Sequence, residues 1–82
     1  MIEYKTRGTC SNKIFFELRD GKVYSVSFEA GCNGNLKALG ILVEGMEAEE
    51  LVRKLKGLHC DDKKTSCADQ LAIAVTQAIG EN

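Results

Sequence analysis

The chain has 82 residues, of which 44% are hydrophobic and 28% charged, and it contains four cysteines, no proline and no tryptophan. This length allows one domain with a small core, and it excludes a large enzyme with its own cofactor-binding fold. Eleven basic and twelve acidic residues give a net charge of −1, which predicts no affinity for nucleic acids or membranes. Small domains often depend on a metal, disulfides or a partner subunit, so the four cysteines need an explanation.

The first third of the sequence predicts β-strands. Residues 13–19 and 23–30 are rich in β-branched and aromatic residues, and an Asp-Gly pair lies between them as a turn signal. These two segments predict an antiparallel hairpin. Residues 1–6 are a candidate third strand, on weaker compositional grounds.

The register of this hairpin depends on its loop. A three-residue loop over residues 20–22 pairs residues whose numbers sum to 42 and makes one face apolar throughout. The resulting pairs are Leu18 with Tyr24, Phe16 with Val26, and Ile14 with Phe28. A two-residue loop, with a sum of 41, would place Phe16 and Ile14 opposite serines. Because the register of a strand follows its buried face, we expect the three-residue loop.

The rest of the sequence predicts helices. Apolar residues recur at helical spacing in three segments, which are residues 35–44, 47–56 and 67–79. Gly45 and Gly57 are typical stop signals for the first two helices. Ser66 is a typical N-cap for the third, with Asp69 three residues on as in a capping box. Strands followed by helices predict one α+β domain over residues 1–82, a small antiparallel sheet with about three helices on one face.

The four cysteines fall at the predicted junctions between elements. They form no C-x₂-C pair, so their spacing alone is a weak signal for a metal site. The preferred hairpin register strengthens the case for a metal site, because the numbers of Cys10 and Cys32 also sum to 42. These two residues would lie opposite each other if the ladder extends that far. Cys67 opens the last predicted helix, where the N-terminal dipole favours a thiolate, and Cys60 lies in the loop before it.

This placement favours one shared metal site. Its ligands would be Cys10, Cys32, Cys60 and Cys67. Four thiolates suit tetrahedral zinc or an iron–sulfur cluster, and the sequence does not separate the two. His59, the only histidine, is an alternative ligand to Cys60. Two other interpretations stay open: a reversible Cys60–Cys67 disulfide used in thiol–disulfide exchange, and buried thiols in a non-catalytic interaction domain.

The compartment is also open to prediction. The N-terminal sequence has no basic segment followed by an apolar one, as a secretory signal would, and no apolar run is long enough to cross a bilayer. We therefore expect a cytoplasmic protein, in which four cysteines favour metal or redox chemistry over structural disulfides. Exposed sheet edges and a small core are consistent with a homodimer.

Three motifs carry a resemblance to a known family. They are AGCNGNL at residues 30–36, LVEGM at residues 42–46 and, above all, TSCADQL at residues 65–71. Together they resemble the TSCPD domain over nearly the whole chain. One departure is Ala68, where the family has the proline of its name. A proline there only pre-sets the first turn of a helix, so its loss leaves Cys67 in place.

This resemblance implies a small protein whose cysteines bind metal. TSCPD segments are also similar to C-terminal extensions of cobalamin-dependent ribonucleotide reductases, which implies an accessory or electron-relay module of such an enzyme. The catalytic barrel of the reductase is a separate and much longer region. A chain of 82 residues is therefore too short to carry ribonucleoside-diphosphate reductase activity alone, and we do not expect an enzyme.

A more distant resemblance is to NifU-type iron–sulfur scaffolds. Cys10, Cys32 and Cys67 occupy the places of the scaffold's cysteines, near the start of a hairpin, at its end and at the start of the last helix. The chain departs from that pattern at Asn12 and Ser66, where the scaffold has Asp and His, and it has a fourth cysteine. A fourth thiolate implies a more closed site and stable binding. The partners implied are ribonucleotide reductase or iron–sulfur machinery.

Overall fold

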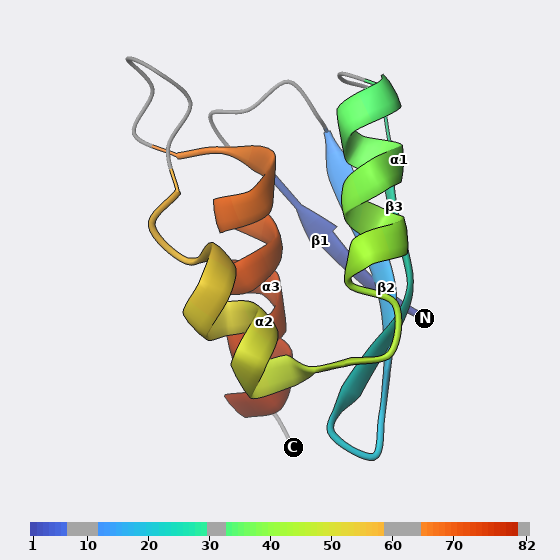
Figure 1. Cartoon of the computed structure of the whole chain (residues 1–82). Coiled ribbons are helices and arrows are strands. Elements are labelled where there is room, and N and C mark those ends of the chain that lie inside the picture. The colour runs from blue at the N-terminus through green and yellow to red at the C-terminus, as the bar shows by residue number, and fades with distance from the viewer. Residues whose placement is uncertain (7–11, 30–32, 59–64, 81–82) are drawn as a thin grey trace.

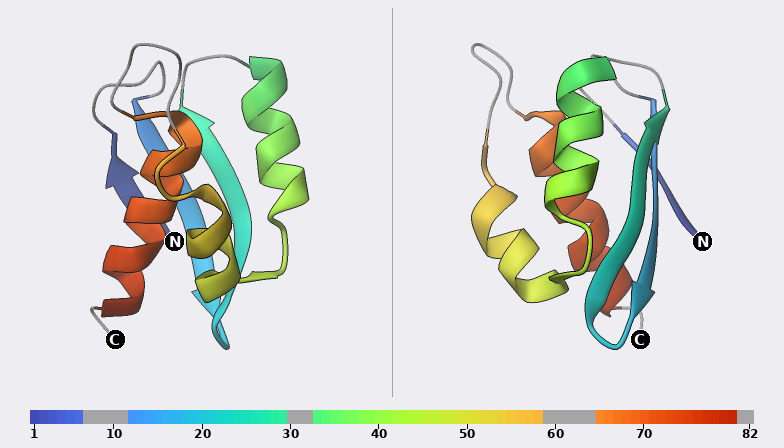
Figure 2. Two further views of the ribbon diagram at one scale, coloured as in Figure 1. Left: turned by 60° about the vertical axis from the view of Figure 1, so that its left-hand side comes forward. Right: turned by 45° about the vertical axis from the view of Figure 1, so that its right-hand side comes forward.

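The structure is a computed structural model that describes residues 1–6, 12–29, 33–58 and 65–80. Within them, a four-stranded antiparallel sheet of order β1-β2-β3-β4 carries three helices on one face (Figures 1 and 2). The elements in chain order are β1 (Ile2–Lys5), β2 (Lys13–Arg19), β3 (Lys22–Glu29), α1 (Asn33–Leu42), β4 (Met46–Glu47), α2 (Ala48–Leu55) and α3 (Cys67–Gly80).

This architecture confirms the α+β prediction. The hairpin, the candidate third strand and the three helices all form, with ends within about two residues of those expected. β4 was not predicted, because two residues between a glycine turn and a helix carry no strand pattern. Among the described helices, none combines the length and the apolar character needed to span a bilayer.

The turn between β2 and β3 differs from the expected one. It has two residues, Asp20 and Gly21, with φ angles of 52° and 76°, as in a type I′ turn. Next to it the paired residues sum to 41, so Leu18 lies opposite Val23. The predicted three-residue loop and the Leu18–Tyr24 pair are therefore wrong. A type I′ turn forms here because its backbone twist matches that of the two strands.

A bulge in β3 then produces the register that the sequence predicted. Ser25 and Val26 of β3 lie against a single residue of β2, Phe16. Ser25 has a φ of 56°, the left-handed conformation in which a bulge residue can fit. Beyond the bulge the paired numbers sum to 42, and Ile14 lies opposite Phe28 as expected.

The bulge changes which side chains of β3 are buried. Before it, Val23 is fully buried, whereas Tyr24 is half-buried beneath Arg19, whose Cζ lies 4.4 Å from the ring centroid. After it, Val26 and Phe28 pack against the core. An unbroken register with a sum of 42 would place Tyr24 in the core, and this expectation is wrong because the extra residue reverses the alternation.

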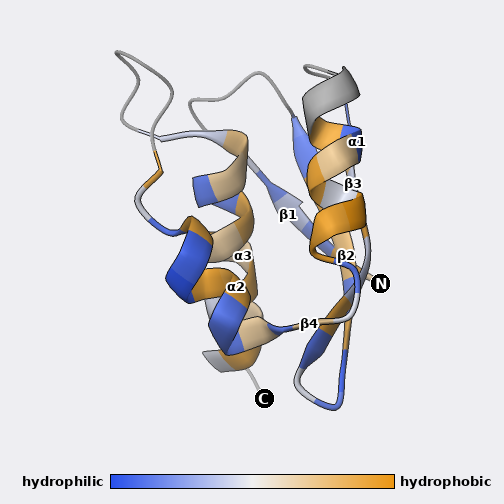
Figure 3. Cartoon of the chain, in the orientation of Figure 1, coloured by the Kyte–Doolittle hydropathy of each residue, from blue (hydrophilic) through white to orange (hydrophobic). Residues whose placement is uncertain are grey.

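The core lies between the sheet and the pair α2 and α3. Its largest fully buried side chains are Phe16, Ile14, Leu51, Leu71, Val23 and Val75. Each such side chain contributes about 1.5–3 kcal/mol to folding. Figure 3 shows that α2 is amphipathic, because it is hydrophilic on its outer side and hydrophobic toward α3.

Helix α1 packs along β3, apart from the other two helices (Figure 1). The approach is closest at Gly40, where an added Cβ would lie 2.8 Å from the carbonyl oxygen of Val26. A glycine is therefore needed at this point of contact between helix and strand. Strand β4 pairs with β3 only at Lys22 and Val23, and α1 lies along the part of β3 beyond them.

Candidate functional site

A network of hydrogen bonds organises the start of α3. Ser66 acts as the predicted N-cap, because its Oγ accepts a hydrogen bond from the backbone N–H of Asp69 at 3.0 Å. The same hydroxyl donates to the carbonyl oxygen of Leu58 at 2.6 Å. The Asp69 carboxylate accepts hydrogen bonds from the backbone N–H of Gly57, at 2.7 Å, and from the hydroxyl of Thr65. The network therefore joins the first turn of α3 to the chain that leaves α2.

Burial strengthens this network. Ser66, Asp69 and Gln70 are all buried. The amide of Gln70 donates to the hydroxyl of Thr65 at 3.1 Å, so Thr65 is held from two sides. A buried polar group that loses its partner costs about 1–3 kcal/mol, so this cluster holds the start of α3 in a single geometry.

Cys67 lies inside this arrangement. It is the first residue of α3, the position that the sequence predicted, and it is 8% exposed. Ser66, directly before Cys67, and Asp69, two residues after it, have the side chains that fix the start of the helix. The position of the Cys67 backbone is therefore set by the network.

The predicted ligands Cys10, Cys32 and Cys60, and the alternative ligand His59, lie outside the described residues. Within residues 1–6, 12–29, 33–58 and 65–80, no group of three or more histidine, cysteine or acidic side chains is arranged to hold a metal ion. The four-cysteine site therefore stays a prediction. What the structure does describe is the set of residues that flank each cysteine.

The flanking residues are joined by hydrogen bonds. On either side of Cys10, the N–H of Thr6 donates to the carbonyl oxygen of Asn12 at 3.0 Å. The N–H of Asn12 in turn donates to the carbonyl oxygen of Glu29, which precedes the segment with Cys32, at 2.8 Å. The bond between Ser66 and Leu58 joins the two sides of the segment with Cys60.

These flanks lie at one end of the molecule. Strands β1 and β3 end there, and β2, α1 and α3 begin there (Figures 1 and 2). The register with a sum of 42 holds up to Lys13 and Glu29, the last described pair of the ladder. The next bond, from the N–H of Asn12 to the carbonyl oxygen of Glu29, joins residues whose numbers sum to 41, so the 42 register is interrupted at Asn12. The predicted pairing of Cys10 with Cys32 needs the 42 register to resume, and it lies beyond the described residues and stays a prediction.

Sequence reasoning missed several residues of this region. Thr65, Gln70 and the N–H of Gly57 were given no role, although they complete the network around Asp69. A run of polar residues directly before an apolar helix was the available signal. It could not show that the chain leaving α2 returns to this helix start.

A family comparison agrees with the motifs. The family model of the TSCPD domain matches residues 2–79. The chain belongs to the TSCPD domain family. The match includes all four cysteines and the Thr65–Asp69 segment. Neither the comparison with curated proteins nor that with solved structures finds a match to this TSCPD domain.

Proposed function

We propose that this TSCPD domain is a small metal-binding protein in which four cysteine thiolates hold one zinc ion or one iron–sulfur cluster. The ligands are Cys10, Cys32, Cys60 and Cys67. The observation that carries the proposal is the convergence of their flanks. Cys10, Cys32 and Cys60 belong to three separate segments of the chain. The described residues that flank these segments all lie at the end of the molecule where α3 begins with Cys67.

The donor set fits such a group. Four thiolates match the tetrahedral preference of zinc and the ligand set of a [2Fe–2S] or [4Fe–4S] cluster. Zinc would supply a structural cross-link, and a cluster would add electron transfer. A reducing compartment such as the cytoplasm would keep the four thiols available for binding.

The hydrogen-bond network gives the protein's own contribution. Asp69 and Ser66 fix the first turn of α3 and both ends of the segment that contains Cys60. A ligand held in place before metal binding loses less conformational entropy on binding. Ser66 and Asp69 therefore serve to position the Cys67 thiolate and the segment that contains Cys60.

The test is anaerobic purification followed by elemental analysis and a visible spectrum. One zinc per chain with no visible absorbance identifies a zinc site, and iron with labile sulfide and a brown colour identifies a cluster. Protein with no bound metal, together with four single Cys→Ser variants that fold as stably as wild type, would contradict the proposal. A metal-free protein with a reversible Cys60–Cys67 disulfide would favour the electron-relay interpretation instead.

A second experiment, which compares two variants, tests whether Cys60 or His59 is the fourth ligand. Cys60→Ser and His59→Ala are prepared in parallel, because the two residues are adjacent in the sequence. We expect Cys60→Ser to lose the metal and His59→Ala to retain it. The reverse result would make His59 the ligand in place of Cys60.

A further inference from the structure

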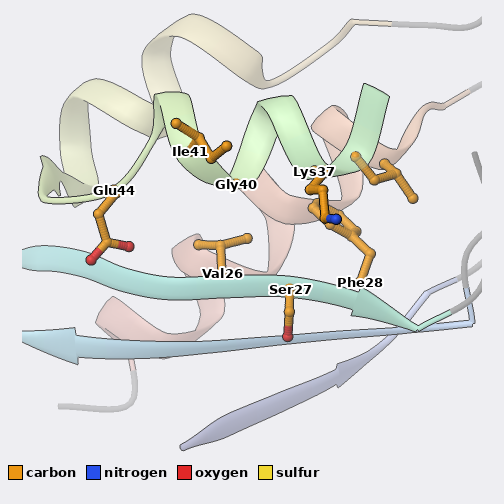
Figure 4. A pocket seen from close by; sticks show the side chains of 8 residues that line it. Val26, Ser27, Phe28, Lys37, Gly40, Ile41 and Glu44 are labelled. Atoms are coloured by element: carbon orange, nitrogen blue, oxygen red, sulfur yellow. The ribbon is translucent and has the colours of Figure 1, made fainter. Parts of the chain in front are cut away.

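An apolar groove runs between α1 and the outer edge of β3, with a volume of about 740 Å³. Figure 4 shows Val26 and Phe28 of β3 pointing toward α1, with Gly40 above them. Leu36 also lines the groove. Apart from Lys22 and Val23, no residue of β3 pairs with β4 in the described part of the chain. The groove therefore adjoins an edge of the sheet that lacks a further strand.

An apolar projection lies beside this groove. Ile41, which lines it, is 73% exposed. Figure 3 shows that α1 is hydrophobic along most of its length, unlike α2. Single exposed apolar residues are common, but one that borders an apolar groove supplies the projection that a self-complementary surface needs. Both a projection and a recess that could receive it belong to the same surface.

The two ends of the groove carry opposite charges. Glu44 lies at one end of it and Lys37 toward the other, beside Phe28, with Gly40 and Ile41 between the two charged residues (Figure 4). The Glu44 carboxylate accepts a hydrogen bond from the N–H of Ser25 at 2.8 Å, which holds it at its end. Lys37 forms no ion pair with another described residue. This surface is thus positive at one end, apolar in the middle and negative at the other.

We infer that two copies of this chain associate through this surface about a two-fold axis, with their α1 helices antiparallel. The axis passes between Gly40 and Ile41, midway between the two charges. Lys37 then faces the partner's Glu44, and Glu44 faces the partner's Lys37. A two-fold interface requires such a self-complementary patch. Ile41 of each copy enters the groove of the other, and the interface uses none of the four cysteines.

The oligomeric state of the full chain, purified with any metal it holds, tests the inference. Sedimentation equilibrium of wild type should give a dimer. Ile41→Glu should give a monomer, and Lys37→Glu should weaken dimerisation by about tenfold or more, because it places like charges opposite each other. Lys5→Glu, the same charge change on the exposed end of β1, is the matched control and should leave the dimer unchanged. Circular dichroism checks that each variant is folded.

A charge-exchange experiment tests the antiparallel arrangement itself. Lys37→Glu and Glu44→Lys should each be weak dimers alone, whereas an equimolar mixture should form heterodimers with both ion pairs restored. Wild type that stays monomeric, or a dimer that Ile41→Glu and Lys37→Glu leave unchanged, would overturn the inference. A dimer that Ile41→Glu abolishes, but that the mixture fails to restore, would overturn the two-fold charge pairing.

Discussion

Single residues fix the contacts that set this fold. At Gly40, a hydrogen lies where any other residue would place a Cβ against the carbonyl oxygen of Val26, at 2.8 Å. At Ser66, one hydroxyl both caps α3 and binds the carbonyl oxygen of Leu58. Each position joins two elements that are distant in sequence, so each substitution below reports on one contact.

Gly40→Ala should destabilise the protein by about 1–3 kcal/mol, because the backbone of Val26 must move away from the added methyl. Helix propensity alone would favour alanine by about 1 kcal/mol, so the sign separates the two effects. Urea denaturation measures the difference. Gly80→Ala is the matched control, since no atom lies within 4 Å of its Cβ position. A Gly40→Ala variant as stable as wild type would mean that α1 does not approach β3 this closely.

Ser66→Ala should lower the free energy of unfolding by about 1–2 kcal/mol, through loss of the N-cap and of the bond to Leu58. Ser66→Thr retains the hydroxyl and is the control, with a smaller loss expected. Chemical denaturation compares the two. Equal losses in both variants would show that side-chain volume, and not the hydrogen bonds, matters at this position.

At the scale of elements, the hairpin shows what sequence pattern can and cannot predict. Apolar alternation predicted β2, β3 and the pair Ile14–Phe28, because burial of one face fixes that register. The pattern missed the two-residue turn and the bulge at Ser25, since two compensating irregularities leave the far end of the ladder in the expected register. It also missed β4, which depends on the N–H of Gly45 donating to the carbonyl oxygen of Val23 at 2.7 Å.

The same limit applies to the candidate site. Residue pattern placed Cys67 at a helix start and Ser66 at its N-cap, because capping depends on neighbours in sequence. The bonds of Asp69 to Gly57 and Thr65 depend on where the chain returns after α2, which no local pattern encodes. Ligand prediction for Cys10, Cys32 and Cys60 rests on sequence and on the described flanks.

The bulge residue Ser25 has a φ of 56°, so a substitution there tests its left-handed conformation. Ser25→Thr should destabilise the protein by about 1 kcal/mol, because β-branched residues rarely adopt the left-handed conformation. Ser27→Thr, two residues along the same strand and also exposed to solvent, is the matched control and should have little effect. Thermal unfolding of both variants provides the measurement. Equal stability of the Ser25→Thr and Ser27→Thr variants would contradict the left-handed conformation of Ser25.

At the scale of the whole molecule, the main core lies between the sheet and the pair α2 and α3, while the flanks of the cysteines gather at one end. A metal at that end would connect the hairpin to the starts of α1 and α3. Anaerobic removal of the metal with a chelator should therefore lower the free energy of unfolding by about 2 kcal/mol or more, a decrease in Tm of about 10 °C. Restoring the metal should reverse it. An unchanged Tm would show that a bound metal has no structural role.

The most direct test of the central claim is the ratio of metal to protein in anaerobically purified wild type and Cys67→Ser, compared side by side. Cys67 is the one proposed ligand whose position the structure describes, in the first turn of α3. Wild type should hold about one zinc ion or one iron–sulfur cluster per chain, and Cys67→Ser should lose it or bind it far more weakly. A wild type without metal, or a variant with the same metal content as wild type, would contradict the account.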